Sequence, residues 1–465
     1  MPGPVTAPKI QRVEGTPAPA GVRSLRALKS AAFVGALGFI CLVAVAATAF
    51  VTDRRVATSA TAASLVTAGS ATGSPAERRI ASARAAIDMH PKRVDGWNDL
   101  ALALARRARE TPAPGYYAEA WQATERALAL EPNHLEARKL QVWILLGQHE
   151  FPRAVEIAER LNKQVPDDVL VYGFLADGYT ELGRYAEAEK AAQWMLDMRP
   201  GNVPALTRAS HLRELFGDHE GAVELMDTAY RRTADAEVED RAWILTQIAH
   251  LSLLTCRTDA AERLLTEALT LFPNYHYALA QMAEVRTQQG RLSEAVAFRE
   301  KHVAVAPHPE NRYALGVALA RAGRLDDARK EWDAFEVAAR AEAAKWDSAN
   351  VELIYYGADH SGKPVDALAL AQREAARRQD VRTLEALAWA LHRNGQSTSA
   401  RKEIDKVLAV GVAQPDTFAR AAAIAAAQGD RGHARQWADR SVSMCSASSA
   451  SEDARAVLAR LRATE

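Results

Sequence analysis

Between Val169 and Asn202 the sequence alternates between apolar stripes of helical period and short turns. In the first half of this segment, apolar residues recur at spacings of three and four, at Tyr172, Leu175, Ala176 and Tyr179, which predicts an amphipathic helix. Gly183 then favours a helix end, because glycine adopts the left-handed backbone that such ends require. A second stripe follows at Ala188, Ala191, Ala192, Met195 and Leu196, and Pro200 ends it. The segment therefore predicts two antiparallel helices joined by a tight turn.

One alanine of this pattern recurs along most of the chain. Its ten copies are Ala120, Ala154, Ala188, Ala222, Ala261, Ala295, Ala328, Ala367, Ala400 and Ala434. Seven of the nine gaps between them are 33 or 34 residues, and the other two are 39. A period of this length is typical of solenoids, in which supersecondary units stack in a row. We expect each alanine to lie where two helices cross so closely that a larger side chain would not fit.

The repeat resembles the tetratricopeptide repeat (TPR), with an aromatic residue, a Leu-Gly/Ala step, a turn glycine, a tyrosine, alanines and a closing proline at fixed positions. The turn glycine recurs as Gly217, Gly290, Gly323, Gly362, Gly395 and Gly429, and Cys256 replaces it in one repeat. The resemblance implies an all-α fold: a TPR-type right-handed α-solenoid of about ten helix-turn-helix repeats. We place this solenoid at residues 80–448 and a C-terminal capping helix at 449–465, since an end repeat needs a polar-backed cover.

The amino-terminal part of the chain predicts a membrane anchor. Residues 31–51 contain no charged residue and no proline, and 21 residues of helix span roughly 30 Å, the thickness of a bilayer's hydrocarbon core. Residues 1–30 form a basic arm, which the positive-inside rule assigns to the cytoplasm. Residues 52–79 are rich in Ala, Ser and Thr and predict a flexible linker. The solenoid is then expected on the periplasmic or extracytoplasmic side of a bacterial inner membrane. A cleaved signal peptide, leaving a secreted protein, is the alternative, because Ala47 to Ala49 offers a cleavage site.

Charge and cysteine content narrow the range of partners. The formal net charge is zero over 465 residues, with a basic excess in the first 55 residues and an acidic excess in the remainder. A mildly acidic solenoid lacks the electrostatic footprint of a nucleic-acid-binding protein. The three cysteines, Cys41, Cys256 and Cys445, are so far apart in repeat number that we expect no disulfide, and none belongs to a Cys-x-x-Cys motif.

In the TPR family, ligands lie in a concave groove lined by the second, fifth, ninth and twelfth positions of each repeat. By resemblance, these positions hold the candidate binding residues Trp143, Trp243, Tyr277, Tyr313, Tyr356, Trp389, His211, His250 and His392. Charged side chains at groove positions include Glu136, Lys139, Glu214, Glu284, Glu352, Asp359, Arg382 and Glu385. Exposed aromatic rings are typical binding anchors. The alternative is that many of these rings pack between repeats, because a shift of one position moves a ring into the core.

No catalytic, metal-binding or cofactor-binding motif stands out in the sequence. It contains no His-Glu-x-x-His, no Gly-x-Ser-x-Gly and no phosphate-binding loop, and the spacing of His211 and His219 is poor for a metal site. We therefore expect no enzyme activity and no cofactor. The interpretation that fits best is a membrane-tethered scaffold or adaptor that binds a protein or an extended peptide, for example in envelope assembly. A solenoid that binds a polysaccharide during synthesis or export of an envelope polymer is the alternative, since rings also stack on sugars.

Overall fold

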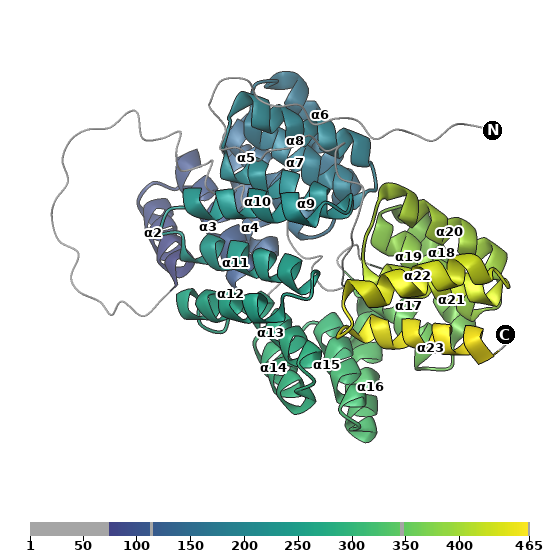
Figure 1. Cartoon of the computed structure of the whole chain (residues 1–465). Helices are drawn as coiled ribbons and strands as arrows, with labels where there is room; N and C mark the ends of the chain where they lie inside the picture. Colours follow the sequence, from purple (N-terminus) through teal and green to yellow (C-terminus); the bar gives the residue numbers. More distant parts are fainter. Residues whose placement is uncertain (1–73, 112–114, 345–347, 464–465) are drawn as a thin grey trace. The chain divides into compact units, whose positions relative to one another are not determined.

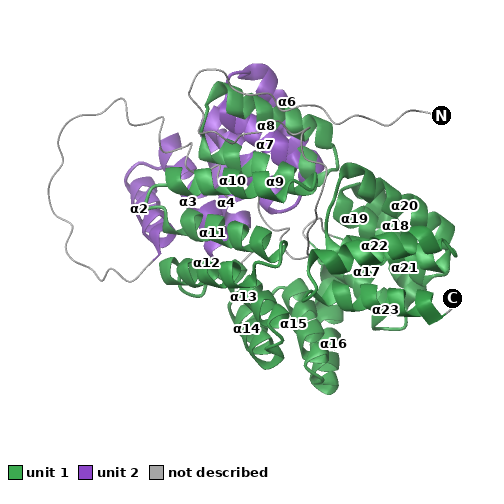
Figure 2. Cartoon of the chain, viewed as in Figure 1, with its two compact units in different colours: residues 1–40, 179–465 green, residues 41–178 purple. Residues whose placement is uncertain are grey.

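The computed structural model of the chain describes residues 74–111, 115–344 and 348–463 (Figure 1). The described residues form 22 α-helices and no β-strand. They divide into two compact units, with the boundary inside helix α7 (Val169–Glu181) (Figure 2). Unit 2 comprises the described residues up to Gly178, and unit 1 those from Tyr179 onward.

Unit 2 holds two helix pairs behind a leading helix. Its helices are α2 (Pro75–Met89), α3 (Val94–Glu110), α4 (Gly115–Leu130), α5 (Leu135–Gly147), α6 (Phe151–Gln164) and the first part of α7. α3 packs against α4, and α5 packs against α6. Helix α2 begins at Pro75, so the predicted linker 52–79 is wrong at its last five residues. The reason is a capping box: Ser74 accepts a hydrogen bond from the Glu77 amide, and Glu77 accepts one from the Ser74 amide.

Unit 1 continues the same arrangement with more pairs. Its helices are α8 (Tyr185–Met198), α9 (Val203–Leu215), α10 (His219–Arg232), α11 (Val238–Leu253), α12 (Thr258–Leu271), α13 (His276–Gln288), α14 (Leu292–Val305), α15 (Pro309–Arg321), α16 (Leu325–Glu342), α17 (Asn350–Asp359), α18 (Pro364–Arg377), α19 (Val381–Arg393), α20 (Ser397–Val410), α21 (Pro415–Ala427), α22 (Arg431–Met444) and α23 (Ser449–Ala463). From α9 to α22, each odd-numbered helix packs against the even-numbered helix that follows it. We call the first helix of each pair helix A and the second helix B. The final helix α23 packs on α21 and α22, as expected of a cap.

The recurring alanine lies at buried helix crossings, which confirms the main sequence prediction. Each of the ten alanines is at most 3% exposed. Where the partner position on helix A is not alanine, the contact is still close. Ser210, for example, donates a hydrogen bond of 2.7 Å to the carbonyl oxygen of Ala222. At this crossing, both helices of the pair therefore carry small side chains.

The turns between helix A and helix B share one backbone conformation. At this turn, φ lies between 53° and 78° at Gly183, Gly217, Cys256, Gly290, Gly323, Gly362, Gly395 and Gly429. At these turns other than the one at Gly362, the residue after the turn donates its amide proton five residues back, as Arg184 does to Tyr179 and Asp218 does to Arg213. Both features belong to the Schellman motif. The predicted turn glycines are thus confirmed, and Cys256 adopts the same left-handed conformation.

Unit 1 coils back on itself. As a result, three of its A–B turns lie against loops that come almost 200 residues later in the chain. The Tyr185 hydroxyl accepts a hydrogen bond of 2.8 Å from the Val381 amide, and Arg378 lies 3.8 Å from Glu181. The next turn, at Gly217, lies against the backbone of Gly411. We call these contacts, together with a disulfide at the third turn, the edge contact.

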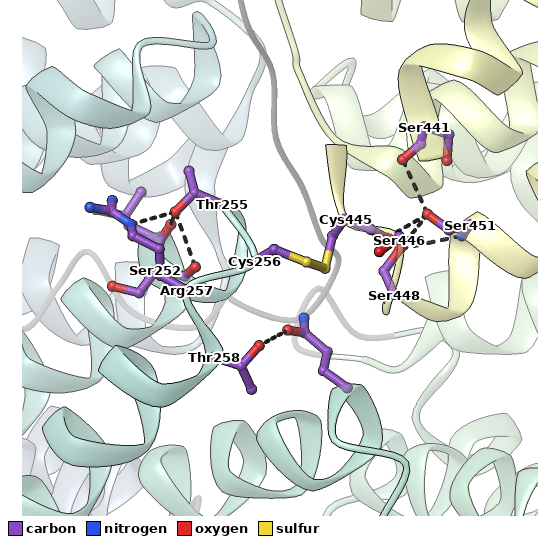
Figure 3. Close-up of a disulfide and its surroundings, with 12 residues drawn as sticks. Ser252, Thr255, Cys256, Arg257, Thr258, Ser441, Cys445, Ser446, Ser448 and Ser451 are labelled. Carbon is purple, nitrogen blue, oxygen red and sulfur yellow. Dashed lines mark hydrogen bonds between the residues drawn. A yellow bond between two sulfur atoms is a disulfide. The ribbon is translucent and has the colours of Figure 1, made fainter. Parts of the chain in front are cut away.

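The disulfide joins Cys256 to Cys445 (Figure 3). The expectation of no disulfide is therefore wrong. That expectation treated the repeats as a straight array, in which two cysteines 189 residues apart in sequence would be separated by several repeats. The coil instead brings the two loops together.

Within the described residues, no helix is both long and apolar enough to cross a membrane. The predicted anchor at 31–51 lies outside those residues.

Candidate functional site

The predicted groove positions of unit 1 lie on its A helices, and the structure distinguishes buried rings from accessible ones. Trp243 and Tyr356 are buried, at 3% and 7% exposed. Tyr277, Tyr313 and Trp389 keep part of their surface exposed. For the buried rings, the alternative of packing between repeats is the one observed. We use the name A-helix face for the surface around the groove positions of seven A helices. These helices are α9, α11, α13, α15, α17, α19 and α21.

In unit 2 the corresponding residues are already engaged within the fold. Trp143 has no exposed surface. Lys139 is buried and pairs with Glu136 at 2.8 Å and with Asp168. These ion pairs hold the pKa of Lys139 above its ordinary value, although burial alone would lower it. The groove residues of unit 2 therefore contribute mainly to its own packing and ion pairing.

At two places on the A-helix face, a carboxylate and a ring nitrogen of successive repeats are within hydrogen-bonding distance. The carboxylate is at the twelfth position of one repeat, and the ring nitrogen is at the ninth position of the next. Glu214 of α9 lies 3.0 Å from Nε2 of His250 on α11, and Asp359 of α17 accepts a 2.9 Å hydrogen bond from Nε1 of Trp389 on α19. This geometry is a consequence of the repeat, because equivalent positions on successive A helices lie side by side.

His211 joins the first of these pairs. Its Nδ1 atom lies 3.7 Å from Glu214, so two of the three predicted groove histidines flank one carboxylate. Burial alone would raise the pKa of Glu214, but the charge of His250 and hydrogen bonds from both histidines lower it below its ordinary value. Among the described residues, no group of histidine, cysteine, aspartate or glutamate side chains is arranged to hold a metal ion.

His392, the third predicted histidine, lies apart from this group. It is partly buried on α19, and its ring centroid lies 5.1 Å from that of Trp389. Burial and the charge of Arg393 lower the pKa of His392. The structure therefore brings His211 and His250 together and places His392 with Trp389 instead.

Charged side chains connect three successive A helices across this face. Arg382 of α19 pairs with Glu352 of α17. Arg420 of α21 pairs with Glu385 of α19, which also accepts a 2.8 Å hydrogen bond from Thr417. We call Glu352, Arg382, Glu385, Asp416, Thr417 and Arg420 the charge ladder. Its two arginines keep part of their surface in solvent: the side chain of Arg382 is 37% exposed and that of Arg420 is 22% exposed, whereas Thr417 is fully buried.

The face curves tightly enough for α17 and α21 to touch across α19. The guanidinium of Arg420 lies 4.7 Å from the centre of the Tyr355 ring, and Asp416 lies 3.7 Å from the same guanidinium. Burial alone would lower the pKa of Arg420, but Tyr355, Glu385 and Asp416 raise it well above its ordinary value. Arg420 is therefore held in its cationic form, and this cationic group covers one face of the Tyr355 ring.

Sequence reasoning found Glu352, Arg382 and Glu385 but missed Arg420. In this repeat the expected groove position is Ala419, and Arg420 lies one residue later. Its long side chain reaches the face from that neighbouring position, which a fixed list of positions does not include. A search for long charged side chains next to groove positions could have found it.

Comparison with known proteins matches one part of the chain to a repeat family. A model of the family described as "Tetratricopeptide repeat" matches residues 174–237. No curated protein matches the chain in sequence. Among solved structures, the chain is similar to a human IFIT1 dimer with PPP-AAAA, at 14% identity and a TM-score of 0.46, covering 79% of this chain and 86% of that one. It is also similar to PilW, described as a type IV pilus biogenesis factor, at 14% identity and a TM-score of 0.37, covering 43% of this chain and 92% of that one. The family match and the repeated helical hairpins support a tetratricopeptide repeat protein.

Proposed function

We propose that the protein is a scaffold whose A-helix face in unit 1 binds an extended segment of a partner protein. The charge ladder is the observation that carries this proposal. An extended peptide presents carbonyl oxygens, amides and charged side chains in alternation. Partly exposed guanidinium and carboxylate groups on successive helices offer partners to all of these groups.

The arrangement of the rings favours a peptide over a polysaccharide. Sugar binding by stacking needs open ring faces, but Trp243 and Tyr356 are buried and the guanidinium of Arg420 lies over Tyr355. The partly exposed rings, Tyr277, Tyr313 and Trp389, lie on different A helices and are better suited to single side-chain contacts. We therefore keep peptide binding as the proposed function, and glycan binding becomes one outcome of the test.

Peptide and glycan arrays probed with the full-length chain would test this proposal. We expect peptides to be retained, and Arg382→Gln to weaken the best peptide at least tenfold, which corresponds to about 1.4 kcal/mol. The matched control is Arg329→Gln, because Arg329 forms an ordinary exposed ion pair with Asp326 on helix B. Equal losses for both variants, or signals on glycans alone, would contradict the proposal.

Our proposal also includes tethering to a membrane through residues 31–51, with the solenoid outside the cytoplasm. The composition of that segment supports tethering, and the Cys256–Cys445 disulfide supports an oxidising compartment. Protease should be added to cells whose outer membrane is permeabilised and whose inner membrane is intact. It should then degrade the solenoid and leave a short membrane-bound fragment. Protection of the solenoid until the inner membrane is lysed would place it in the cytoplasm instead, and recovery in the medium would indicate a secreted protein.

A further inference from the structure

The Cys256–Cys445 disulfide is the covalent part of the edge contact. Cys256 occupies the turn between α11 and α12, and Cys445 follows α22 (Figure 3). Their Cα atoms lie 5.2 Å apart, within the usual range for a disulfide. The bond therefore joins two turns of the coil at the point where they already lie together.

The backbone at Cys256 has a conformation that favours glycine. Its φ of 53° is left-handed, and the equivalent turns at Gly183, Gly217 and Gly290 use glycine. A residue with a Cβ atom is less stable than glycine in this conformation, because its Cβ comes too close to the following carbonyl oxygen. Glycine would therefore make the better turn, and what cysteine adds at this position is the cross-link.

The two sulfur atoms differ in how a reagent can reach them. Cys445 is 1% exposed, whereas Cys256 is partly exposed. Cys256 also lines a shallow, open pocket together with Arg257, Thr258, Asp259, Ala260 and Arg263. A thiolate entering this pocket meets Cys256 first. Two guanidinium groups against one carboxylate on the lining favour an anionic reagent.

We propose that Cys256–Cys445 is a reducible latch on the edge contact, opened by a small anionic thiol that attacks Cys256 from this pocket. In the first step the thiolate bonds to Sγ of Cys256, the disulfide breaks, and Cys445 leaves as a thiolate that takes up a proton. In the second step another thiolate displaces Cys256 from the mixed disulfide. Two electrons thus pass to the protein, and the small thiol becomes its own disulfide.

Reduction removes the covalent link and leaves the other edge contacts to hold the coil. These include the hydrogen bond between Tyr185 and Val381, the ion pair between Arg378 and Glu181 and the packing of Gly217 on Gly411. Each is modest in energy, since a single hydrogen bond or a partly exposed ion pair contributes little net stability. We expect the reduced coil to open there more often. This inference does not depend on the proposed peptide binding.

The attack site can be tested with glutathione on the full-length chain carrying Cys41→Ser. Limiting glutathione followed by rapid alkylation should trap the glutathione adduct on Cys256 at least tenfold more often than on Cys445, as measured by mass spectrometry. Arg257→Gln and Arg263→Gln should together slow reduction by glutathione several-fold and slow reduction by 2-mercaptoethanol much less, because glutathione carries two carboxylates beside its thiolate and 2-mercaptoethanol carries none. Lys402→Gln and Lys406→Gln together, on helix α20, are the charge-matched control. Adducts found mainly on Cys445, or reduction only after unfolding, would overturn the proposal.

The latch itself can be tested by hydrogen exchange in the oxidised and reduced protein. We expect the Val381 amide and the peptide around residues 411–413 to exchange at least tenfold faster after reduction. Cys256→Gly should show the faster exchange without any reductant, and it should fold, because glycine suits the local backbone. Identical exchange in all three forms would show that the disulfide does not hold the edge contact closed.

Discussion

His302 is a buried histidine surrounded by groups that disfavour its protonation. It is 5% exposed on α14, and its ring centroid lies 6.1 Å from that of His276. Burial, together with the charges of Arg299, His276 and His308, lowers the pKa of His302 to about 2. Arg299 interacts in turn with Glu284, and burial raises the pKa of that carboxyl group. His302 is therefore neutral in the folded protein.

We predict that His302 makes the fold sensitive to acid. In the unfolded chain its pKa returns to about 6.5, so between pH 6.5 and pH 2 the unfolded state binds more protons than the folded state. Stability from this residue is fully present above pH 6.5 and falls as the pH decreases. Between pH 6.5 and pH 5 the loss is about 2 kcal/mol.

Urea unfolding of the wild type and of His302→Met, at pH 7 and pH 5, measures this effect. The variant should lose about 2 kcal/mol less on acidification than the wild type. His90→Gln, which changes an exposed histidine in unit 2, serves as the control. The same acid response in all three proteins would show that His302 is not the residue responsible.

At the scale of the helix pair, small residues set how closely two helices cross. Gly316 of α15 lies directly beneath the Trp332 ring of α16, and a Cβ atom at Gly316 would overlap that ring. Trp332 is 9% exposed, and its ring stacks on His360, with centroids 4.2 Å apart. The ring is thus held by contacts with both Gly316 and His360.

Gly316→Ala should destabilise the protein by about 1–3 kcal/mol, because the added methyl group displaces a confined ring. In an open helical position the same change would stabilise by about 0.5–1 kcal/mol. Gly432→Ala on α22 provides that comparison, since the nearest atom to a Cβ there is 3.8 Å away. Thermal melting followed by circular dichroism should give opposite shifts for the two variants. A stabilised Gly316→Ala would mean that the crossing is looser than the structure indicates.

The capping box at the start of α2 predicts a local effect. Ser74→Ala removes the side-chain acceptor of the Glu77 amide and should destabilise the helix by about 1 kcal/mol. Hydrogen exchange in the first turn of α2 should rise about fivefold, the factor to which 1 kcal/mol corresponds, and exchange in α4 should not change. Protection that is unchanged in α2 would show that Pro75 alone is enough to begin the helix.

Most of the repeated elements could be predicted from the sequence, because their cause is local and recurs. Ala222 and Gly217 occupy the crossing and the turn that the period assigned to them. The start of α2 was missed because a capping box depends on four residues rather than on apolar period. The sequence could not decide whether Trp143 is buried, because a groove-lining position and a core-packing position differ by one residue along a helix.

At the scale of unit 1, the edge contact depends on how the repeats curve, which no local pattern encodes. Small differences in the angle between successive pairs add up over many residues. Cys256 and Cys445 are consequently distant in sequence and close in space. The same curvature brings Arg420 over Tyr355. Both features were beyond sequence reasoning for this reason.

Two turn glycines with the same backbone conformation make it possible to distinguish the stability that comes from the edge contact from the stability of the turn itself. Gly183 and Gly290 have φ values of 75° and 71°. A Cβ atom at Gly183 would overlap the carbonyl oxygen of Gln379, and one at Gly290 would meet nothing within 4 Å. Alanine should destabilise both turns, and Gly183→Ala by about 1–3 kcal/mol more than Gly290→Ala.

Urea unfolding gives this difference directly, and exchange of the Val381 amide shows whether the extra loss arises at the edge contact. Faster exchange in Gly183→Ala and wild-type exchange in Gly290→Ala are the expected results. If both variants lose the same stability, the two turns of the coil are not in contact in solution.

The edge contact has a consequence for how this protein can evolve. An open solenoid tolerates the duplication or loss of a repeat, because each repeat touches only its neighbours. Here the turn at Gly183 lies against the loop at Gln379, and Cys256 bonds Cys445. Removing one unit of about 34 residues from between them would shift every later loop against the wrong turn and would bring Cys445 towards a glycine. The edge contact therefore constrains the number of repeats between these residues. We expect this part of the sequence to diverge by substitution and by loop insertions that point outward.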